Sequence, residues 1–362
     1  APYFSAFGDS SGSEDPKIVI NFGQRAFSHT IPTGYKKLCS KNLPTPTIKN
    51  GEDHFKGITY TGNATSRNIV SGFATDLVWV KRRSGAESHV LSNRVVGANS
   101  LLMSNSNAVD NTANGCVTAF NTDGVTVGTQ GIVNDNNETF VSWHWKESAS
   151  AGFDIVAYTG SGNAQNVAHS LGVAPDVGIF KKRSEAYNWM VYTELIDGSN
   201  DYLHLNTTNA KIDSGWSTLL DSSSNIQMEG DSQSLNDDGE NYIAYLFSSV
   251  EGFSKHSIYT GNDSADGPFV YTGFTPAFIM FKNTSITTDW HMYDTARGLY
   301  NVVTMSVEAN KDTAEQSGSG QYIDIYSNGF KPRGTSAAIN SNDNVYLYMA
   351  FAERPFKYAN AR

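Results

Sequence analysis

The chain has 362 residues, with 26 Lys and Arg against 36 Asp and Glu and a formal net charge of −10. This length exceeds one ordinary hydrophobic core and predicts several domains. Hydrophobic residues make up 39% of the chain and aromatic residues 12%, a composition that excludes a disordered protein. Because the charge is acidic and no basic stripe occurs, we expect no nucleic-acid binding. No apolar run reaches the roughly 18 residues of a membrane span, so we expect no membrane insertion.

The first 43 residues stand apart from the rest of the chain. Residues 18–24 predict a strand leading into a turn, and residues 31–38 predict a turn leading into a strand. This segment is too short for a core of its own, so we interpret 1–43 as the C-terminal strands of a larger β domain, with further chain before Ala1. Pro44 and Pro46 favour extended backbone, and 44–53 is therefore predicted to be a linker.

The remaining chain is a threefold repeat with a period of about 100 residues. The motif Tyr60-Thr61-Gly62-Asn63 returns as Tyr158-Thr159-Gly160-Ser161 and as Tyr259-Thr260-Gly261-Asn262. A hydrophobic run ending in lysine follows each motif, at 77–81, 177–181 and 278–282, and each copy closes with an apolar run, at 140–145, 242–247 and 346–351. The predicted repeat domains are 54–151, 152–251 and 252–362.

Apolar spacing within each copy follows period two, or a short continuous run between Gly, Asn and Ser, and is typical of strands. We therefore predict an all-β fold class, with tandem antiparallel β-sandwich domains of jelly-roll or concanavalin-like type. The best short helical segments are 92–96 and 312–316. Trp189 and Trp290 occupy the same repeat position, which favours core packing for both.

Two parts of the sequence resemble proteins of bacteriophage virions. Residues 19–27, with Pro32-Thr33-Gly34-Tyr35-Lys36 and Leu43-Pro44, resemble the C-terminal end of SPRY-like (concanavalin-like) domains of virion proteins. The repeat copies, with Gly152-Phe153, 169–175 and 252–255, resemble a repeat domain of unassigned function in phage tail-fibre and other surface proteins, marine ones especially. The resemblance implies a structural protein at the surface or tail of a virion. It supplies no catalytic or binding residues, and the first copy departs from it at 71–75.

The search for catalytic chemistry finds no local motif. The eight histidines are at least 25 residues apart, and Cys39 and Cys116 lie in different segments, so we expect free buried thiols, no metal site and no cofactor. Phosphate-binding and nucleophile-elbow motifs are absent from the sequence, and we predict that the protein is not an enzyme. Glycan hydrolysis needs two paired carboxyl groups. The sequence offers many acids without singling out a pair: Glu185, Glu194, Asp197, Asp201, Glu229 and Asp231.

A polar run precedes each closing strand, at 134–138, 236–240 and 340–344. Clustered side-chain oxygens are ligands for Ca²⁺, but the same composition is typical of hairpin turns. The spacing does not match an EF-hand, and we favour the turn interpretation.

Aromatic side chains without a repeat partner are the best candidates for ligand binding, because sugar rings stack on flat π surfaces. Tyr187 and Trp216 meet this criterion, and Tyr300 is a weaker candidate. We expect the repeats to bind a host-surface polysaccharide through several weak sites, multiplied in a homo-oligomer, with a trimer favoured. Other virion subunits are the second expected partner. The alternatives are a capsid decoration or spacer protein with only virion contacts, and a glycan-degrading depolymerase.

Overall fold

The computed structural model describes residues 25–36, 42–112, 115–318, 320–355 and 357. The chain divides into two compact units, Ala1–Pro44 and Thr45–Arg362. In the first unit the Tyr35 N–H donates to the Pro32 carbonyl at 3.1 Å, which forms the predicted turn. The strand predicted at 18–24, most of the SPRY-like segment 19–27 and Cys39 lie outside the described residues.

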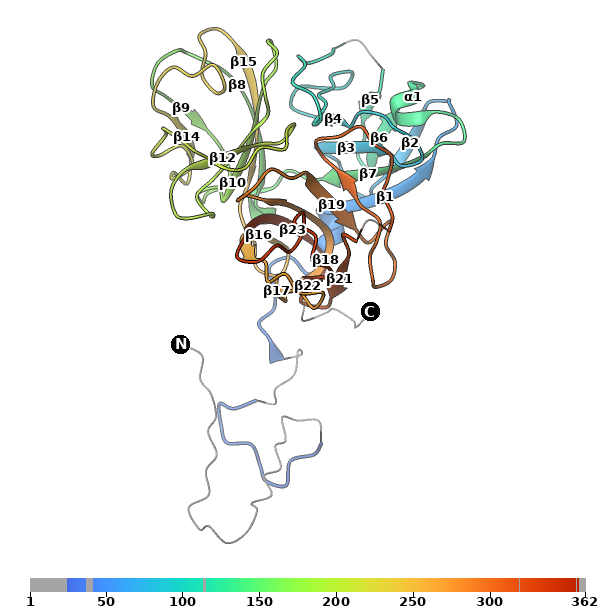
Figure 1. Cartoon of the computed structure of the whole chain (residues 1–362), viewed down its shortest axis with the longest axis vertical. Coiled ribbons are helices and arrows are strands. Elements are labelled where there is room, and N and C mark those ends of the chain that lie inside the picture. The colour runs from blue at the N-terminus through green and yellow to red at the C-terminus, as the bar shows by residue number, and fades with distance from the viewer. Residues whose placement is uncertain (1–24, 37–41, 113–114, 319, 356, 358–362) are drawn as a thin grey trace. The chain divides into compact units, whose positions relative to one another are not determined.

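The second unit is built from three β modules, which group around a common centre in Figure 1. Module 1 holds β1 (Phe55–Thr61), β2 (Arg67–Val70), β3 (Leu77–Arg82), β4 (Val90–Asn93), β5 (Val117–Phe120), β6 (Gly124–Val127) and β7 (Thr139–Trp145). Module 2 holds β8 (Phe153–Thr159), β9 (Gln165–Ala168), β10 (Val177–Lys182), β11 (Met190–Thr193), β12 (Asp201–His204), β13 (Ile212–Asp213), β14 (Asn225–Met228) and β15 (Asn241–Phe247). Module 3 holds β16 (Ser254–Thr260), β17 (Val270–Tyr271), β18 (Phe274–Asn283), β19 (Trp290–Asp294), β20 (Val307–Glu308), β21 (Ile323–Tyr326), β22 (Gly329–Pro332) and β23 (Val345–Pro355).

Each module has one large and one small antiparallel sheet, and this confirms the predicted all-β sandwich class. The large sheets have the orders β1-β7-β3-β4, β8-β15-β10-β11-β12-β13 and β16-β23-β18-β19-β20. The small sheets are β2-β6-β5, β9-β14 and β17-β22-β21. In each large sheet the last strand of the module lies between the first and third strands. The register of its pairing with the first strand therefore shows which residues of the three modules are equivalent. Trp145, Phe247 and Phe351 are one such set.

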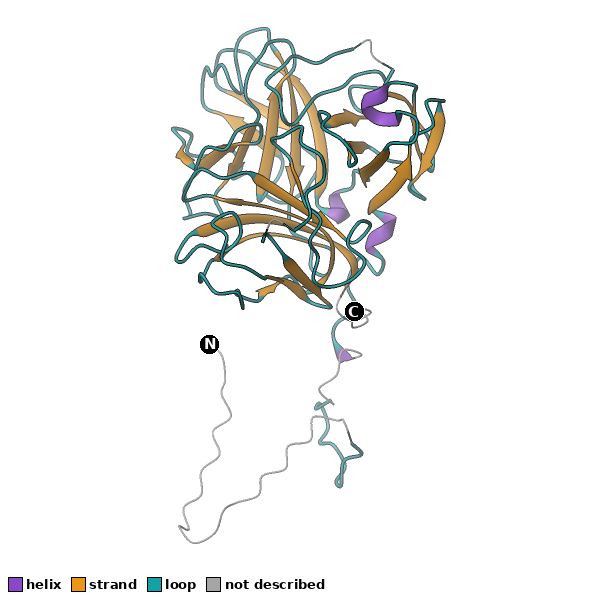
Figure 2. Ribbon diagram, turned by 45° about the vertical axis from the view of Figure 1, so that its right-hand side comes forward, coloured by secondary structure: helices purple, strands orange, loops and turns teal. Residues whose placement is uncertain are grey.

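The short helices expected at 92–96 and 312–316 are not formed, and that prediction was wrong. Ser92 belongs to β4 and pairs with Val78, while Gln316 forms an isolated bridge with Ser306. Pairing with a neighbouring strand gives these backbone groups hydrogen-bond partners. A five-residue helix forms too few hydrogen bonds to offset the entropy lost when its first turn forms. The helices that Figure 2 draws in the second unit are short: η2 (Gly51–Asp53), α1 (Gly131–Asn134) and η3 (Ala149–Ala151). Over the described ranges, no helix has the length and apolar character to cross a membrane.

The repeated Tyr-Thr-Gly motif joins the first strand of each module to its closing turn. The tyrosine hydroxyl donates to a carbonyl before that turn at 2.7–2.8 Å: Tyr60 to Val133, Tyr158 to Leu235 and Tyr259 to Ile339. At the motif glycine the two segments approach so closely that a Cβ would lie 2.0–2.2 Å from a carbonyl oxygen, at Gly62, Gly160 and Gly261. Glycine is therefore required there.

The polar runs before the closing strands are turns held by a buried asparagine. The Asn236 amide donates to the carbonyls of Asn163 and Gly230 and accepts from the Ser161 N–H. Asn134 and Asn340 make equivalent bonds, and all three side chains are fully buried. The amide oxygens and nitrogens are used within the fold, which supports the turn interpretation.

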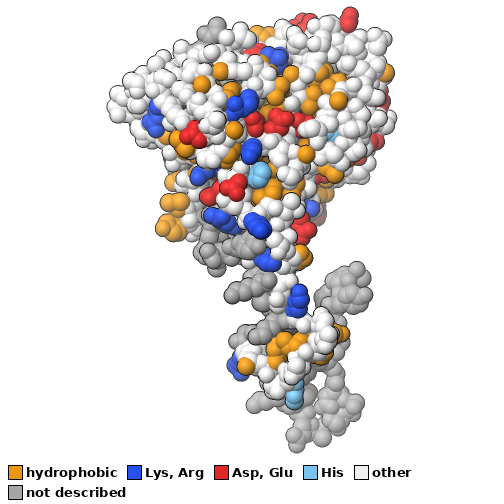
Figure 3. Space-filling model, turned by 180° about the vertical axis from the view of Figure 1, so that it is seen from behind, with side chains coloured by type: hydrophobic (Ala, Val, Ile, Leu, Met, Phe, Trp, Pro, Cys, Tyr) orange, Lys and Arg blue, Asp and Glu red, His pale blue; other side chains and the backbone are white. Residues whose placement is uncertain are grey.

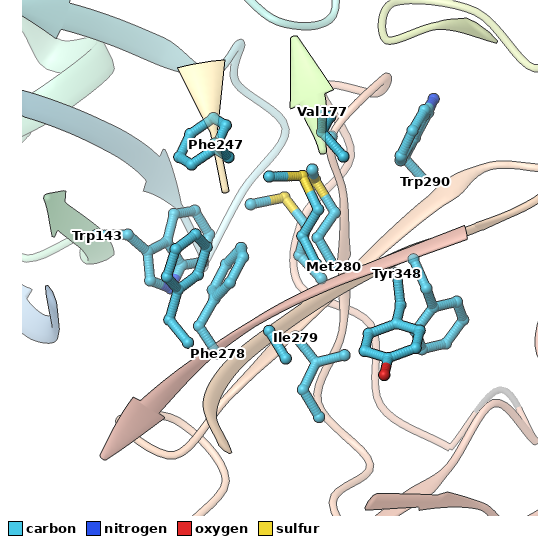
Figure 4. Close-up of a cluster of buried hydrophobic side chains, with 14 of the residues drawn as sticks. Trp143, Val177, Phe247, Phe278, Ile279, Met280, Trp290 and Tyr348 are labelled. Atoms are coloured by element: carbon cyan, nitrogen blue, oxygen red, sulfur yellow. The ribbon is translucent and has the colours of Figure 1, made fainter. Parts of the chain in front are cut away.

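One hydrophobic core unites the three modules. In Figure 4, Trp143, Phe247 and Met280, one from each module, point into the same volume. Nearby, the Phe351 ring lies 5.7 Å from that of Trp145 and 5.8 Å from that of Phe247. Twelve apolar side chains, four from each module, enclose a cavity of about 20 Å³ at this centre. The modules thus pack around a pseudo-threefold axis.

A closed ring of three hydrogen bonds links the modules around this axis. The Trp189 indole N–H donates to the Met103 carbonyl of module 1, and the Trp290 indole N–H to the His204 carbonyl of module 2, both at 2.9 Å. His89 takes the equivalent place in module 1, and its Nε2 lies 3.0 Å from the Glu308 carbonyl of module 3. Each module is therefore bonded to the one before it, and the last to the first.

The tautomer of His89 completes the ring. Its Nδ1 accepts the indole N–H of Trp79 at 2.8 Å, so the proton of the neutral ring stands on Nε2 and is donated to Glu308. Burial lowers the pKa of His89 well below its usual value, which keeps the imidazole neutral. A protonated His89 would present a donor to the Trp79 N–H and break this arrangement.

The lysine that ends each repeated hydrophobic run is buried, and two of the three lysines bond across a seam between modules. Lys81, Lys181 and Lys282 are fully buried, and burial lowers the pKa of each to about 8. Lys282 donates to the Thr208 carbonyl of module 2 at 3.0 Å, and Lys81 to the Asp312 carbonyl of module 3 at 3.2 Å. Carbonyl oxygens thus satisfy the ammonium groups where water is absent.

The segment expected as a linker is packed onto module 3 from Ile48 onward. Ile48 is buried in the shared core, and a Cβ on Gly51 would lie 2.0 Å from the Ala352 carbonyl oxygen. The apolar contact of Ile48 holds this segment against the closing strand β23, so it is part of the second unit.

The ring predicts that Trp290→Phe destabilises the protein more than Trp145→Phe. Both indoles are buried, but the Trp145 N–H has no hydrogen-bond partner among the described residues, whereas Trp290 satisfies a carbonyl. Leaving that carbonyl unpaired costs about 1–2 kcal/mol beyond the loss of packing. Urea unfolding of both variants measures the difference, and equal losses would contradict the role of the ring.

The buried histidines predict loss of stability on acidification. Burial lowers the pKa of His144 to about 3 and of His256 and His291 to about 4, and it holds the pKa of His89 well below its usual value. Below about pH 6.5 the unfolded chain binds these protons and the folded chain does not. Each histidine therefore lowers the free energy of unfolding by about 1.4 kcal/mol per pH unit, from pH 6.5 down to its pKa in the folded state. Glu147 and Glu194, whose pKa burial raises to about 7, act in the opposite direction but are fewer.

Urea midpoints at pH 7, 6 and 5 test this prediction. His89→Gln isolates the contribution of one histidine, since an amide can accept from Trp79 and donate to Glu308 without titrating. We expect the variant to lose less stability than the wild type between pH 7 and 5. Equal pH dependence of the two proteins would show that His89 does not take part.

Candidate ligand-binding site

Module 2 lacks the third strand of its small sheet. In modules 1 and 3 this strand is β5 or β21, and it is bonded to the segment that reaches the edge of the large sheet: Asn99 N–H to Val117, and Val303 N–H to Ile323. In module 2 the corresponding chain forms β13, which extends the large sheet, and then the irregular segment 214–224. The two-stranded small sheet leaves the outer face of β11 and β12 without a covering strand.

A pocket of about 390 Å³ lies on this face. Period two places Val191 and Leu203 in the shared core and turns Met190, Tyr192 and Tyr202 toward the pocket. The other lining residues come from β12, β13 and the adjoining loops: Tyr187, Asn188, His204, Asp213, Ser214, Gly215, Trp216 and Ser234. Five of the eleven lining side chains are aromatic or imidazole rings.

The Tyr202 ring contacts two other rings of the lining. The Tyr202 ring lies 5.4 Å from that of Tyr192 and 5.6 Å from that of His204. On the loop side, the backbone N–H of Trp216 donates to the Ser214 hydroxyl at 3.0 Å. The Tyr187 N–H donates to the Asn107 carbonyl of module 1 at 3.0 Å, so the seam between modules positions this wall of the pocket.

Asp213 supplies the formal charge of the pocket. It is largely exposed, and the Lys211 ammonium 2.9 Å away lowers its pKa, so the carboxyl is ionised at neutral pH. Burial lowers the pKa of His204, which makes that ring neutral. Asn188, Ser214 and Ser234 add neutral polar groups. The lining thus combines aromatic faces, neutral hydrogen-bonding groups and one carboxylate.

Asp213 also belongs to a cluster of three carboxylates with Asp197 and Asp201. The Lys211 ammonium lies among them, 2.5 Å from Asp197, 3.1 Å from Asp201 and 2.9 Å from Asp213. It lowers the pKa of Asp197, and the three carboxylates in turn raise the pKa of Lys211. A lysine therefore occupies the position that a cation would take in this cluster.

The acids that the sequence offered for catalysis have other partners or lie at the surface. Glu185 pairs with Lys182, and Glu194 accepts from Asn200 while burial raises its pKa to about 7. Glu229 accepts from Ser217 and Thr218, and Asp231 is exposed. With Asp197 and Asp201 held by Lys211, none of the six lines the pocket.

The two aromatic residues predicted to bind ligand, Tyr187 and Trp216, lie in the same pocket. Trp189 and Trp290 are fully buried, as their shared repeat position predicted, and Tyr300 is 82% exposed in module 3. Sequence reasoning missed Tyr192, Tyr202 and Asp213. The alternation of apolar residues along β11 and β12 was a signal for the two tyrosines, but it does not say which face is covered. Cys116 is buried, as expected.

The family comparison identifies residues 50–355 with the model of DUF7483, described as a domain of unknown function. The matched region begins just before η2 and ends with β23, so it spans the three modules. The comparison with curated proteins finds no match.

The lysine-filled cluster predicts a calcium response that appears only when Lys211 is replaced. Lys211→Met removes the ammonium and leaves three carboxylates in mutual repulsion, so we expect a lower melting temperature that millimolar CaCl₂ partly restores. The wild-type melting temperature should not change with CaCl₂. Adding Asp197→Asn to the variant should abolish the rescue. A wild-type shift as large as that of the variant would contradict the prediction.

Proposed function

This chain belongs to the DUF7483 family, and we propose that it is a non-enzymatic, glycan-binding structural protein of a bacteriophage virion surface, of tail-fibre type, with its sugar site in the module 2 pocket. The observation that carries the proposal is the meeting of Tyr187 and Trp216 over Tyr192 and Tyr202 in one pocket. The virion assignment comes from the sequence resemblance of the repeat copies to phage surface proteins.

The pocket suits a sugar in both size and chemistry. About 390 Å³ lies within the range of small-molecule sites. Aromatic rings stack on the C–H faces of a sugar, while Asn188, Ser214 and Asp213 are placed to exchange hydrogen bonds with its hydroxyl groups. A purely apolar ligand would leave these polar groups unsatisfied.

The composition of the pocket favours binding over hydrolysis. A glycosidase needs two carboxyl groups about 5–9.5 Å apart on either side of the scissile bond. Asp213 is the only carboxylate among the described lining residues, and Lys211 holds it in the ionised form. A group that stays ionised cannot act as the general acid. We therefore place the depolymerase alternative behind the binding function.

The structure has this pocket in one module and not in all three, so the expected source of multivalent binding changes. In modules 1 and 3 a third small-sheet strand lies where module 2 has its pocket. The three repeats are therefore not three copies of one site, and multivalent attachment to a host surface would come from association of several chains. A homotrimer that contacts other virion subunits remains the arrangement we propose.

Binding to an array of bacterial surface polysaccharides, which includes neutral, amino and acidic sugars, tests the proposed function. We expect Trp216→Ala and Tyr187→Ala to weaken binding by about tenfold or more, since each removes a stacking surface from the pocket. Tyr300→Ala is the matched control, because it removes an aromatic ring exposed elsewhere.

Two outcomes of the array would contradict the proposal. Binding that survives both pocket substitutions would place the sugar elsewhere on the chain. Failure to bind any polysaccharide, together with binding to virion subunits in a pull-down, would favour the decoration or spacer alternative. Release of shorter oligosaccharides from the array would indicate a depolymerase.

A further inference from the structure

We infer that the module 2 pocket selects a hexosamine with a free amino group and disfavours acidic sugars. This inference rests on the proposed glycan-binding function and names the class of sugar. It is carried by the charge of the pocket lining and of the carboxylate cluster beside it.

The lining carries a single formal charge, and that charge is negative. Of the eleven described residues around the pocket, none is Lys or Arg, and Asp213 is the only acid. His204 is neutral. A carboxylate on the sugar would therefore meet like charge with no cation to bind it, whereas an ammonium group would meet an exposed carboxylate.

The surroundings add to this negative potential. Asp213 shares Lys211 with Asp197 and Asp201, so carboxylates outnumber the ammonium in the cluster. The lysine of the neighbouring strand β10, Lys182, is likewise committed, to Glu185 and Asp237 at 2.5 and 2.8 Å. Both lysines are paired within the fold. The rim of the pocket therefore keeps a net negative charge from carboxylates that no lysine neutralises.

The aromatic lining acts in the same direction. The face of a Trp or Tyr ring attracts a cation through its quadrupole. Trp216 and Tyr202 lie in the same pocket as Asp213, so an ammonium held by the carboxylate would stand close to π faces. The same rings accept the C–H face of the sugar, which lets one ligand use both features.

Affinities of the full chain for glucosamine, N-acetylglucosamine and glucuronic acid at pH 7 and low salt test the inference. We expect glucosamine to bind about two- to fivefold more tightly than N-acetylglucosamine, the strength of one partly exposed ion pair, and glucuronic acid to bind most weakly. The preference should shrink in 0.5 M NaCl, which screens exposed charges. Asp213→Asn should make the first two affinities equal.

Asp238→Asn is the matched control, because it removes an exposed carboxylate of the same module that does not line the pocket. It should retain the preference for glucosamine. If Trp216→Ala weakens binding but wild type binds N-acetylglucosamine or glucuronic acid as tightly as glucosamine, the inference is wrong while the proposed function stands. If none of the three sugars binds and the polysaccharide array is also negative, the proposed function itself fails.

Discussion

The three hydrogen bonds that close the ring of modules are the constraint on which the rest of the structure depends. Each joins a buried ring nitrogen of one module to a carbonyl oxygen of the preceding module, at His89, Trp189 and Trp290. Because the third bond returns from module 1 to module 3, no seam is free to open alone. One face of each large sheet meets the shared core, and in modules 1 and 2 the other face packs with that module's own small sheet in a separate core.

This arrangement separates the part of a module that is fixed from the part that is free to change. Residues on the inner face must fit two other modules, and they include the fully buried Trp143 and Trp290. The outer face need only fit its own small sheet. Module 2 has one small-sheet strand fewer, and its pocket is lined by the partly exposed Tyr202 of β12 and the buried Tyr192 of β11. The proposed binding pocket thus lies where packing demands are weakest.

The sequence predicted the strands and the repeats well, but it did not predict that the three modules close into a ring. Period two and the Tyr-Thr-Gly motif predicted the strands, and the absence of a repeat partner singled out Tyr187 and Trp216, which lie in one pocket. The ring could not be foreseen, because the acceptors at Met103, His204 and Glu308 are backbone carbonyls that any residue supplies. His89 follows Lys81 at the same spacing as Trp189 follows Lys181 and Trp290 follows Lys282, but the sequence does not show that its ring bonds to module 3. The missing third strand escaped detection because 214–224 has the Ser-rich composition of a loop.

The ring and the pocket are physically joined at β12. His204 contributes its ring to the pocket and its carbonyl to the Trp290 indole of module 3, so one residue serves both structures. On the opposite wall, the backbone of Tyr187 is bonded to Asn107 of module 1. Both neighbouring modules therefore hold walls of a pocket whose lining belongs to module 2.

Over residues 45–355 on the face drawn in Figure 3, basic and acidic side chains are interspersed, without an extended basic area. In the proposed sugar site, selectivity would depend on the pocket lining, and the closed ring of modules holds two walls of that lining in place.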